Sequence, residues 1–233
     1  MPTRIAQRLL LIGNGVNLIA KNHQGTSYRS LLKNAAVAKG ITVSKKSEVE
    51  ELDRLLSAYA EAHPEDDPYT LIYSDLRALC PTHAHHLLAT LAPDFFRILS
   101  LNYDSAMEKA LQLRTQQAKA SPLAKIPCLG KSKVCHIHGL LNSTNAQESQ
   151  CVLSPASYRT ALKLFPVRLP EQFWVKECSI DTPWYQAFIT HEVHICGASL
   201  YDSELLLWRA FELRKQWIDS LVAQQRWQNR IFV

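Results

Sequence analysis

Short, continuously apolar runs that alternate with helical patterns constrain the fold of this chain most strongly. The runs that predict strands are residues 9–12, 95–101, 134–137, 151–153, 193–196 and 231–233. Because these runs lack polar alternation, we expect helices to cover both faces of the sheet. Helical patterns occupy residues 28–38, 47–62, 68–80, 82–91, 105–113, 183–190 and 202–223. This alternation predicts an α/β fold with a mainly parallel sheet.

The stretch 40–92 contains helical patterns without a convincing strand. We interpret it as a helical insertion between the first two strands. A length of 233 residues suits one large domain or two small ones. Because no linker rich in Pro, Gly or Ser divides the chain, we expect a single domain over residues 1–233 that carries this insertion.

Composition excludes several classes of protein. A hydrophobic fraction of 47% with a net charge of +5 argues against disorder. No apolar run approaches the roughly 20 residues that span a bilayer, and the first run indicates a strand rather than a signal peptide, so we expect a cytoplasmic protein without a membrane partner. Lysine and arginine are scattered, which makes nucleic acid an improbable partner. None of the six cysteines forms a C-x-x-C pair, so we expect no metal.

Small or polar residues directly follow four of the predicted strands. These motifs are Gly13-Asn14-Gly15-Val16-Asn17, Asn102-Tyr103-Asp104, His138-Gly139 and Gly197-Ala198-Ser199. Parallel strands end at the same edge of a sheet, and ligands of open α/β folds bind just beyond that edge. The four motifs are therefore expected to converge on one cleft.

Each motif also has a purely structural interpretation. Gly13 and Gly15 allow a tight turn whose N–H groups can approach a phosphate, yet such a turn also connects a strand to a helix. Asp104 is equally suited to an Asx turn or a helix cap. His138 alone could be an ordinary buried histidine, although Gly139 beside it indicates close approach to the backbone.

Together these motifs resemble the sirtuin-like domain family, and especially the NAD-hydrolysing effectors of bacterial anti-phage defence. The resemblance is carried by G-N-G-V-N at 13–17, L-N-Y-D-S-A-M-E at 101–108, H-I-H-G at 136–139, W-Y-Q-A-F at 184–188 and I-C-G-A-S-L-Y-D-S-E at 195–204. It implies a Rossmann-like three-layer fold that binds NAD as a substrate. The chain lacks the paired cysteines of the zinc module in protein-deacylating sirtuins, which favours hydrolysis of NAD itself.

The resemblance also implies roles for individual residues. Asn102 matches the asparagine that orients the nicotinamide ribose or the attacking water, Asp104 the acidic residue that supports this geometry, and His138 the catalytic histidine. The residues implied to line the NAD site are Gly13, Asn14, Gly15, Asn17, Gly139, Gly197, Ser199 and, more weakly, Asp202.

The implied activity is that of a NAD+ glycohydrolase, an effector of anti-phage defence that depletes NAD in abortive infection. Such an enzyme needs restraint, so we expect a homo-oligomer or a complex with a separate sensor subunit, for which a nucleotide-sensing protein is one candidate. Trp208, Trp217 and Trp227 would be either core residues or interface anchors. The alternatives are a NAD-dependent deacylase or ADP-ribosyltransferase, and a non-catalytic module that binds NAD or ADP-ribose.

Overall fold

A single sheet of five parallel strands forms the centre of the molecule. The computed structural model describes residues 8–19, 27–66, 68–111, 134–140, 151–152, 155–168, 182–200, 204–220 and 231–233. Its strands are β1 (Arg8–Ile12), β2 (Arg97–Ser100), β3 (Val134–His136), β4 (Glu192–Cys196) and β5 (Ile231–Phe232). Every strand pairing is parallel, in the order β3-β2-β1-β4-β5. The predicted Rossmann-like α/β fold is confirmed.

The expected strand at 151–153 is wrong for its described part, because Cys151 and Val152 belong to no strand. Val152 instead joins two loops: its N–H donates to the carbonyl oxygen of His138 at 2.9 Å, and its own carbonyl accepts from the Tyr103 hydroxyl at 2.7 Å. These bonds use the main-chain groups that a strand would give to a neighbour. Leu153 lies outside the described residues.

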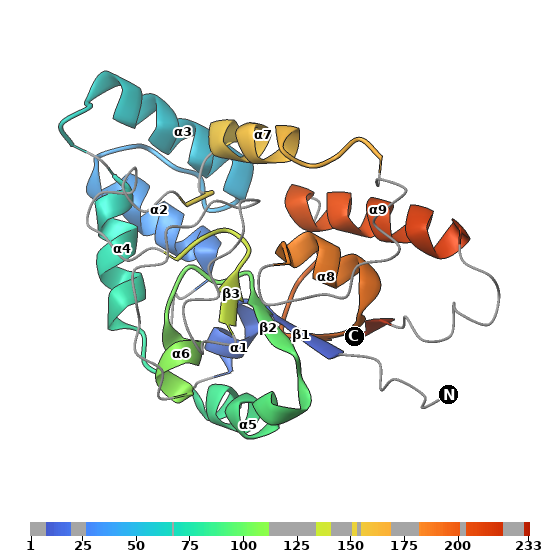
Figure 1. Ribbon diagram of the computed structural model, residues 1–233. Helices are drawn as coiled ribbons and strands as arrows, with labels where there is room; N and C mark the ends of the chain where they lie inside the picture. Colours follow the sequence, from blue (N-terminus) through green and yellow to red (C-terminus); the bar gives the residue numbers. More distant parts are fainter. Residues whose placement is uncertain are drawn as a thin grey trace, which may run out of the picture.

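Helices cover both faces of the sheet, as the apolar runs predict. Alternate residues along a strand point to opposite faces. Leu9 and Leu11 of β1 pack with helices α8 (Trp184–Thr190) and α9 (Leu205–Ser220). Leu10 and Ile12 pack with α5 (His83–Leu91) and α6 (Ala106–Ala110). Figure 1 shows the strands lying between these two helical layers.

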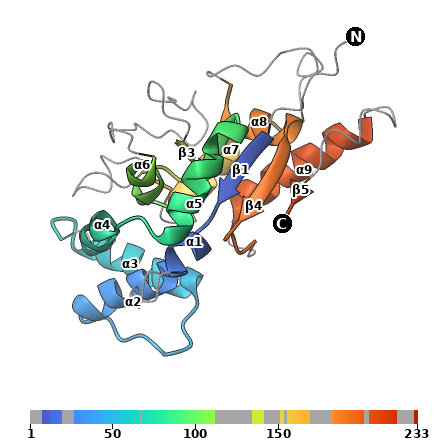
Figure 2. The ribbon, with the colours of Figure 1, turned by 90° about the horizontal axis from the view of Figure 1, so that it is seen from below.

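Three helices form a group of their own beyond the end of β1. They are α2 (Tyr28–Ala38), α3 (Val49–Ala62) and α4 (Tyr69–Ala78), and they share a buried apolar cluster that includes Leu32, Leu52 and Ile72. In Figure 2 this group lies past α1 (Gly15–Leu18), the short helix that follows β1. Helix α5 lies within the range 40–92 but packs on the sheet, whereas α2 lies before this range and packs with α3 and α4. The expected insertion over 40–92 stays a prediction.

Two other segments complete the described fold. The one-turn helix η1 (Ala92–Asp94) leads from α5 into β2. Helix α7 (Pro155–Lys163), which the sequence analysis did not predict, contacts both α3 and α9. It therefore links the helical group to the layer of α8 and α9, and it carries a tyrosine that enters the site described below.

The order in which the strands join the sheet places a crevice beside β1. The chain adds β2 and β3 on one side of β1, and then β4 and β5 on the other. This reversal is a topological switch point, where ligands of open α/β sheets bind beyond the carboxyl ends of the strands. The loops after β1, β2, β3 and β4 meet at this edge.

Candidate active site

Two glycine turns pack backbone to backbone at the switch point. The N–H of Gly13 donates to the Cys196 carbonyl at 3.0 Å, and the N–H of Gly15 donates to the Gly197 carbonyl at 2.7 Å. A Cβ on Gly15 would lie 2.6 Å from that carbonyl oxygen, and Gly197 has a φ of +63°. The two N–H groups are therefore engaged inside the protein, and contact between the turns accounts for the glycines.

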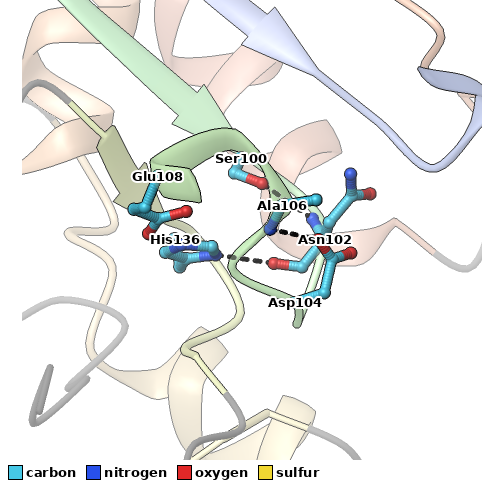
Figure 3. Close-up of polar contacts among 6 residues, drawn as sticks. All are labelled: Ser100, Asn102, Asp104, Ala106, Glu108 and His136. Carbon is cyan, nitrogen blue, oxygen red and sulfur yellow. Dashed lines mark hydrogen bonds and ion pairs between the residues drawn. The ribbon is translucent and has the colours of Figure 1, made fainter. Parts of the chain in front are cut away.

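Asp104 joins the loop after β1 to the loop after β2. Its Oδ2 accepts a hydrogen bond of 2.8 Å from the side chain of Asn17, which also donates to Asn14 Oδ1 at 2.9 Å. Its Oδ1 accepts from the N–H of Ala106 at 2.8 Å, as the Asx-turn interpretation predicts (Figure 3). Asn17 and Asp104 are both buried. Asp104 therefore holds two of the predicted motifs together.

Asn102 is held through its backbone, and its side-chain amide is left with an unused acceptor. Its N–H donates to Ser100 Oγ at 3.1 Å, its carbonyl accepts from His136 Nδ1 at 2.7 Å, and its Nδ2 donates to the Gly13 carbonyl at 3.3 Å. Asn102 Oδ1 is buried, and no group among the described residues hydrogen-bonds it. A buried carbonyl oxygen without a partner is costly, so this atom is suited to accept a bond from a water or hydroxyl.

A buried ion pair between His136 and Glu108 supports the backbone of Asn102. His136 Nε2 lies 2.6 Å from Oε1 of Glu108 on α6. Burial lowers the pKa of His136, but the charge and hydrogen bonds of Glu108 prevail and raise it to about 8. Burial likewise opposes ionisation of Glu108, yet His136 holds the pKa of this carboxyl below its usual value. His136 is thus an imidazolium that donates from both ring nitrogens, and the Asn102 amide points away from this pair (Figure 3).

The sequence analysis did not single out either member of this pair. Both lie inside motifs that it quoted, since His136 is the first histidine of H-I-H-G and Glu108 ends L-N-Y-D-S-A-M-E. The sequence signal for this pair was a histidine that begins one quoted motif and an acid that ends another. Their contact is visible only in the structure, where His136 of β3 lies beside Ser100 of β2 and Glu108 reaches it from α6.

His138 follows β3 in the loop next to that of Asn102. The N–H of Ile137 donates to the Ser100 carbonyl at 2.8 Å, which carries the β2–β3 pairing to the edge of the sheet. The His138 ring is 1% exposed and lies 5.8 Å from the Tyr103 ring, centroid to centroid. Gly139 then turns with a φ of +87°, where a side chain would be strained. The structure therefore brings His138 and the loop of Asn102 together.

A group of aromatic residues connects this site to the helical group. Tyr28 of α2 stacks on Tyr103 with the ring centroids 5.4 Å apart. Its hydroxyl donates to Oδ1 of Asp53 on α3 at 3.4 Å. Burial raises the pKa of Asp53 to about 7, and the hydrogen bond from Tyr28 only partly opposes this. The Asp53 carboxyl beneath the site therefore keeps its proton to a higher pH than an ordinary carboxyl does.

Comparison with known families identifies the family of this chain. A model of the SIR2-like domain matches residues 97–220, just over half of the chain. The chain belongs to the SIR2-like domain family. A search of curated proteins finds no match. SIR2-like domains are typically NAD-utilising enzymes, which gives the chain a NAD-related function. The matched region holds Asn102, Asp104 and His138, whereas the turn at 13–17 precedes it.

The remaining predicted residues of this SIR2-like site have different outcomes. Gly197 belongs to the packed turns, while Ser199 is exposed two residues later and takes no part in the hydrogen bonds described above. Asp202 lies outside the described residues. In the part of the chain that the structure describes, no three His, Cys, Asp or Glu residues gather as ligands for a metal. No helix within the same part is long and apolar enough to cross a membrane.

Proposed function

We propose that this SIR2-like protein is a NAD+ glycohydrolase, which cleaves NAD to nicotinamide and ADP-ribose. The observation that carries the proposal is the presence of two groups on neighbouring loops at the switch point. One is the unpartnered amide oxygen of Asn102, and the other is the imidazole of His138. Membership of the family supplies the NAD-related function, and hydrolysis is the reaction that we infer for it.

The proposed chemistry suits these residue types. The bond between nicotinamide and C1′ of the ribose breaks, nicotinamide leaves with the electron pair, water adds at C1′ and one proton is released. Because nicotinamide is already cationic in NAD, no strong acid is needed, and positioning with electrostatic stabilisation supplies the catalysis. Asn102 Oδ1 would orient the water or a ribose hydroxyl. His138 would accept the proton as a general base.

The test is release of nicotinamide from NAD by the purified protein. We expect Asn102→Ala and His138→Ala each to lower turnover about 10²–10⁴-fold. Matched controls are Asn34→Ala and His86→Ala, which alter an exposed asparagine and an exposed histidine elsewhere in the chain. Thermal unfolding of all four variants checks that they fold. Equal turnover by the wild type and both site variants would contradict the proposal.

Other outcomes of the assay select other functions. Consumption of NAD only when an acyl-lysine peptide is present would indicate a deacylase. Transfer of ADP-ribose to a protein would indicate a transferase. Binding of NAD by calorimetry without turnover, with neighbouring gene products present, would indicate a non-catalytic module.

Within the same proposal, the enzyme is an effector of anti-phage defence that depletes NAD once it is activated. An unrestrained NADase would exhaust the NAD of its own cell, so we infer control by self-assembly or by a separate sensor subunit, with a nucleotide-sensing protein as one candidate. Trp208 on α9 supports an interface because it is 40% exposed, whereas Trp217 is buried and Trp227 lies outside the described residues. Light scattering and NAD cleavage, measured with and without proteins encoded beside it, test this control. A fully active monomer would contradict it.

A further inference from the structure

His138 has a partner on each nitrogen of its ring. Its Nε2 lies 2.8 Å from Oε2 of Glu204, and its Nδ1 lies 3.4 Å from the hydroxyl of Tyr158. Tyr158 comes from α7, and Glu204 immediately precedes α9. The imidazole is almost fully buried, while 23% of the Glu204 side chain is exposed. Segments from two layers of the fold therefore converge on one histidine.

The contact with Glu204 assigns the tautomer of His138, and the contact with Tyr158 is compatible with it. An ionised carboxylate only accepts hydrogen bonds, so the nitrogen that faces Glu204 must carry a hydrogen. Burial, and then the charge of Glu204, raise the pKa of Tyr158 well above its ordinary value, so the tyrosine keeps its proton and can donate. The hydroxyl of Tyr158 can therefore donate to the lone pair that this tautomer leaves on Nδ1. Neutral His138 accordingly carries its hydrogen on Nε2 and its lone pair on Nδ1.

We propose that Glu204 is the positioning residue for His138, an inference that rests on the proposed function. Its carboxylate holds the hydrogen on Nε2 and so makes Nδ1 the atom that accepts a proton from water or a ribose hydroxyl. When that proton arrives, Nε2 keeps its own, and Glu204 stabilises the imidazolium, as the buried acid of a serine-protease triad does. The 3.4 Å contact with Tyr158 is longer than a good O–H···N bond, so a hydroxyl of the substrate can displace it at low cost.

The position of Glu204 in the fold allows this role to be separated from a structural one. Its main-chain carbonyl accepts from the N–H of Trp208 at 3.0 Å, which begins the hydrogen bonding of α9 without the side chain. Truncation of the side chain therefore leaves the start of the helix intact. Glu212 provides a matched control, because it is an exposed glutamate on α9 that forms an ion pair with Arg209.

The first experiment measures NAD cleavage by Glu204→Ala, Glu204→Gln, Glu212→Ala and the wild type. We expect Glu204→Ala to lower kcat about 10–100-fold, the range seen when a supporting carboxylate is removed, and to change KM by less than about threefold. Added formate should restore part of kcat in Glu204→Ala and none in His138→Ala, because a small carboxylate can replace only the missing acid. A purely structural role would not give this rescue. Glu204→Gln should also lose kcat, since it keeps the shape and loses the charge, while Glu212→Ala should match the wild type.

The second experiment needs no substrate and so separates the two proposals. Nitrogen NMR of protein labelled with ¹⁵N-histidine reports which ring nitrogen carries the hydrogen, and His138→Ala assigns the signal. We expect the Nε2–H form in the wild type and a mixture of tautomers in Glu204→Ala. If the wild type fails to cleave NAD both with and without the proteins encoded beside it, the proposed function fails, and this spectrum still decides whether Glu204 sets the tautomer. The inference is overturned by an unchanged tautomer in Glu204→Ala, or by an active wild type whose kcat is equalled or exceeded by Glu204→Ala.

Discussion

His136 Nδ1 donates a 2.7 Å hydrogen bond to the main-chain carbonyl of Asn102, so a buried imidazole supports the backbone from which the candidate catalytic amide projects. Its other nitrogen is fixed by Glu108 at 2.6 Å. The support is directional, because a protonated imidazole donates from both nitrogens in fixed directions. The position of Asn102 therefore depends on the buried pair of His136 and Glu108.

Loss of the imidazole should accordingly impair catalysis through Asn102. We expect His136→Gln to lower kcat for NAD cleavage about 10–100-fold, because Gln cannot bond both Glu108 and the Asn102 carbonyl from the same position. Steady-state kinetics with wild type, His136→Gln and His83→Gln measure the effect. His83 is an exposed histidine at the start of α5 and provides the control. A variant with wild-type kcat that remains folded would show that Asn102 does not need this support.

The same pair predicts how stability changes with pH. The folded-state pKa of His136, about 8, lies above its ordinary value of 6.5, so folding favours the protonated ring. The stabilisation is complete below pH 6.5 and is lost as the pH rises through about 8. Glu108, whose pKa is lowered, contributes above its ordinary value of 4.5 and loses that contribution in acid. Other charged groups near His136 act in the same sense, since Asp104 also raises its pKa.

Denaturant unfolding at pH 6 and pH 9 tests this expectation. The free energy of unfolding of the wild type should fall by about 1–2 kcal/mol more than that of His136→Gln, because one pKa unit corresponds to about 1.4 kcal/mol. Glu108→Gln should remove most of the difference, since the imidazolium then lacks its partner. If the free energy of unfolding changed with pH in parallel for the wild type and both variants, the ion pair between His136 and Glu108 would not contribute to stability.

The periodicity of the sequence was enough to predict the layers of the fold. Continuous apolar runs gave β1 and β4, and Tyr28–Ala38 forms a helix with the bounds expected from its pattern. Each of these elements has a regular pattern of apolar residues along its own length, and that pattern is visible in the sequence. The described part of the run at 151–153 forms no strand, because the main-chain groups of Val152 bond to loops. Helix α7 was missed because its sequence is weakly apolar, and it contacts α3 and α9, which are distant in the chain.

The candidate site was predictable only in part, for a related reason. Asn102 and His138 stand at the ends of strands, and that position is visible in the sequence. Glu108, Glu204 and Tyr158 act through contacts across 28, 66 and 20 residues, which no local pattern encodes. Motifs therefore reveal the residues at the strand ends of the candidate site, whereas the residues that contact them from elsewhere become visible only with the fold.

The packed glycine turns lead to a prediction about stability. A Cβ on Gly15 would lie 2.6 Å from the Gly197 carbonyl oxygen and 2.9 Å from its Cα, and neither backbone atom can move freely. We expect Gly15→Ala to lower the free energy of unfolding by about 2–3 kcal/mol, the cost of overpacking a rigid site. Gly40→Ala is the control, because Gly40 has a φ of +72° but nothing within 4 Å of a Cβ. It should lose only about 1–2 kcal/mol from backbone strain.

The two glycine variants should also differ in how they bind NAD. Gly15→Ala disturbs the edge of the sheet where the four motifs meet, so calorimetry should show weaker NAD binding even at temperatures where the variant is folded. Gly40 lies after α2 in the helical group, so Gly40→Ala should bind NAD as the wild type does. Equal stability and equal binding for the two variants would show that contact between the turns is unimportant.

Asp53 predicts a dependence on pH of the same sign as that of His136, but at lower pH. Burial raises its folded-state pKa to about 7 from an ordinary value of 3.8, with a smaller contribution from Glu50. A carboxyl group of this kind takes up a proton on folding, so it makes the folded state less stable as the pH rises from about 4 to 7.

Asp53→Asn removes the titration and keeps an oxygen that can accept from the Tyr28 hydroxyl. At pH 8 we expect this variant to exceed the wild type in free energy of unfolding by about 2–4 kcal/mol, the linkage energy of a shift of this size. At pH 4 the two should be equal within about 0.5 kcal/mol, because both side chains are then neutral. Glu51→Gln, an exposed change on the same helix, should track the wild type at both pH values. An Asp53→Asn variant that gives no extra stability at pH 8 would show that Asp53 is ionised without penalty beneath Tyr28.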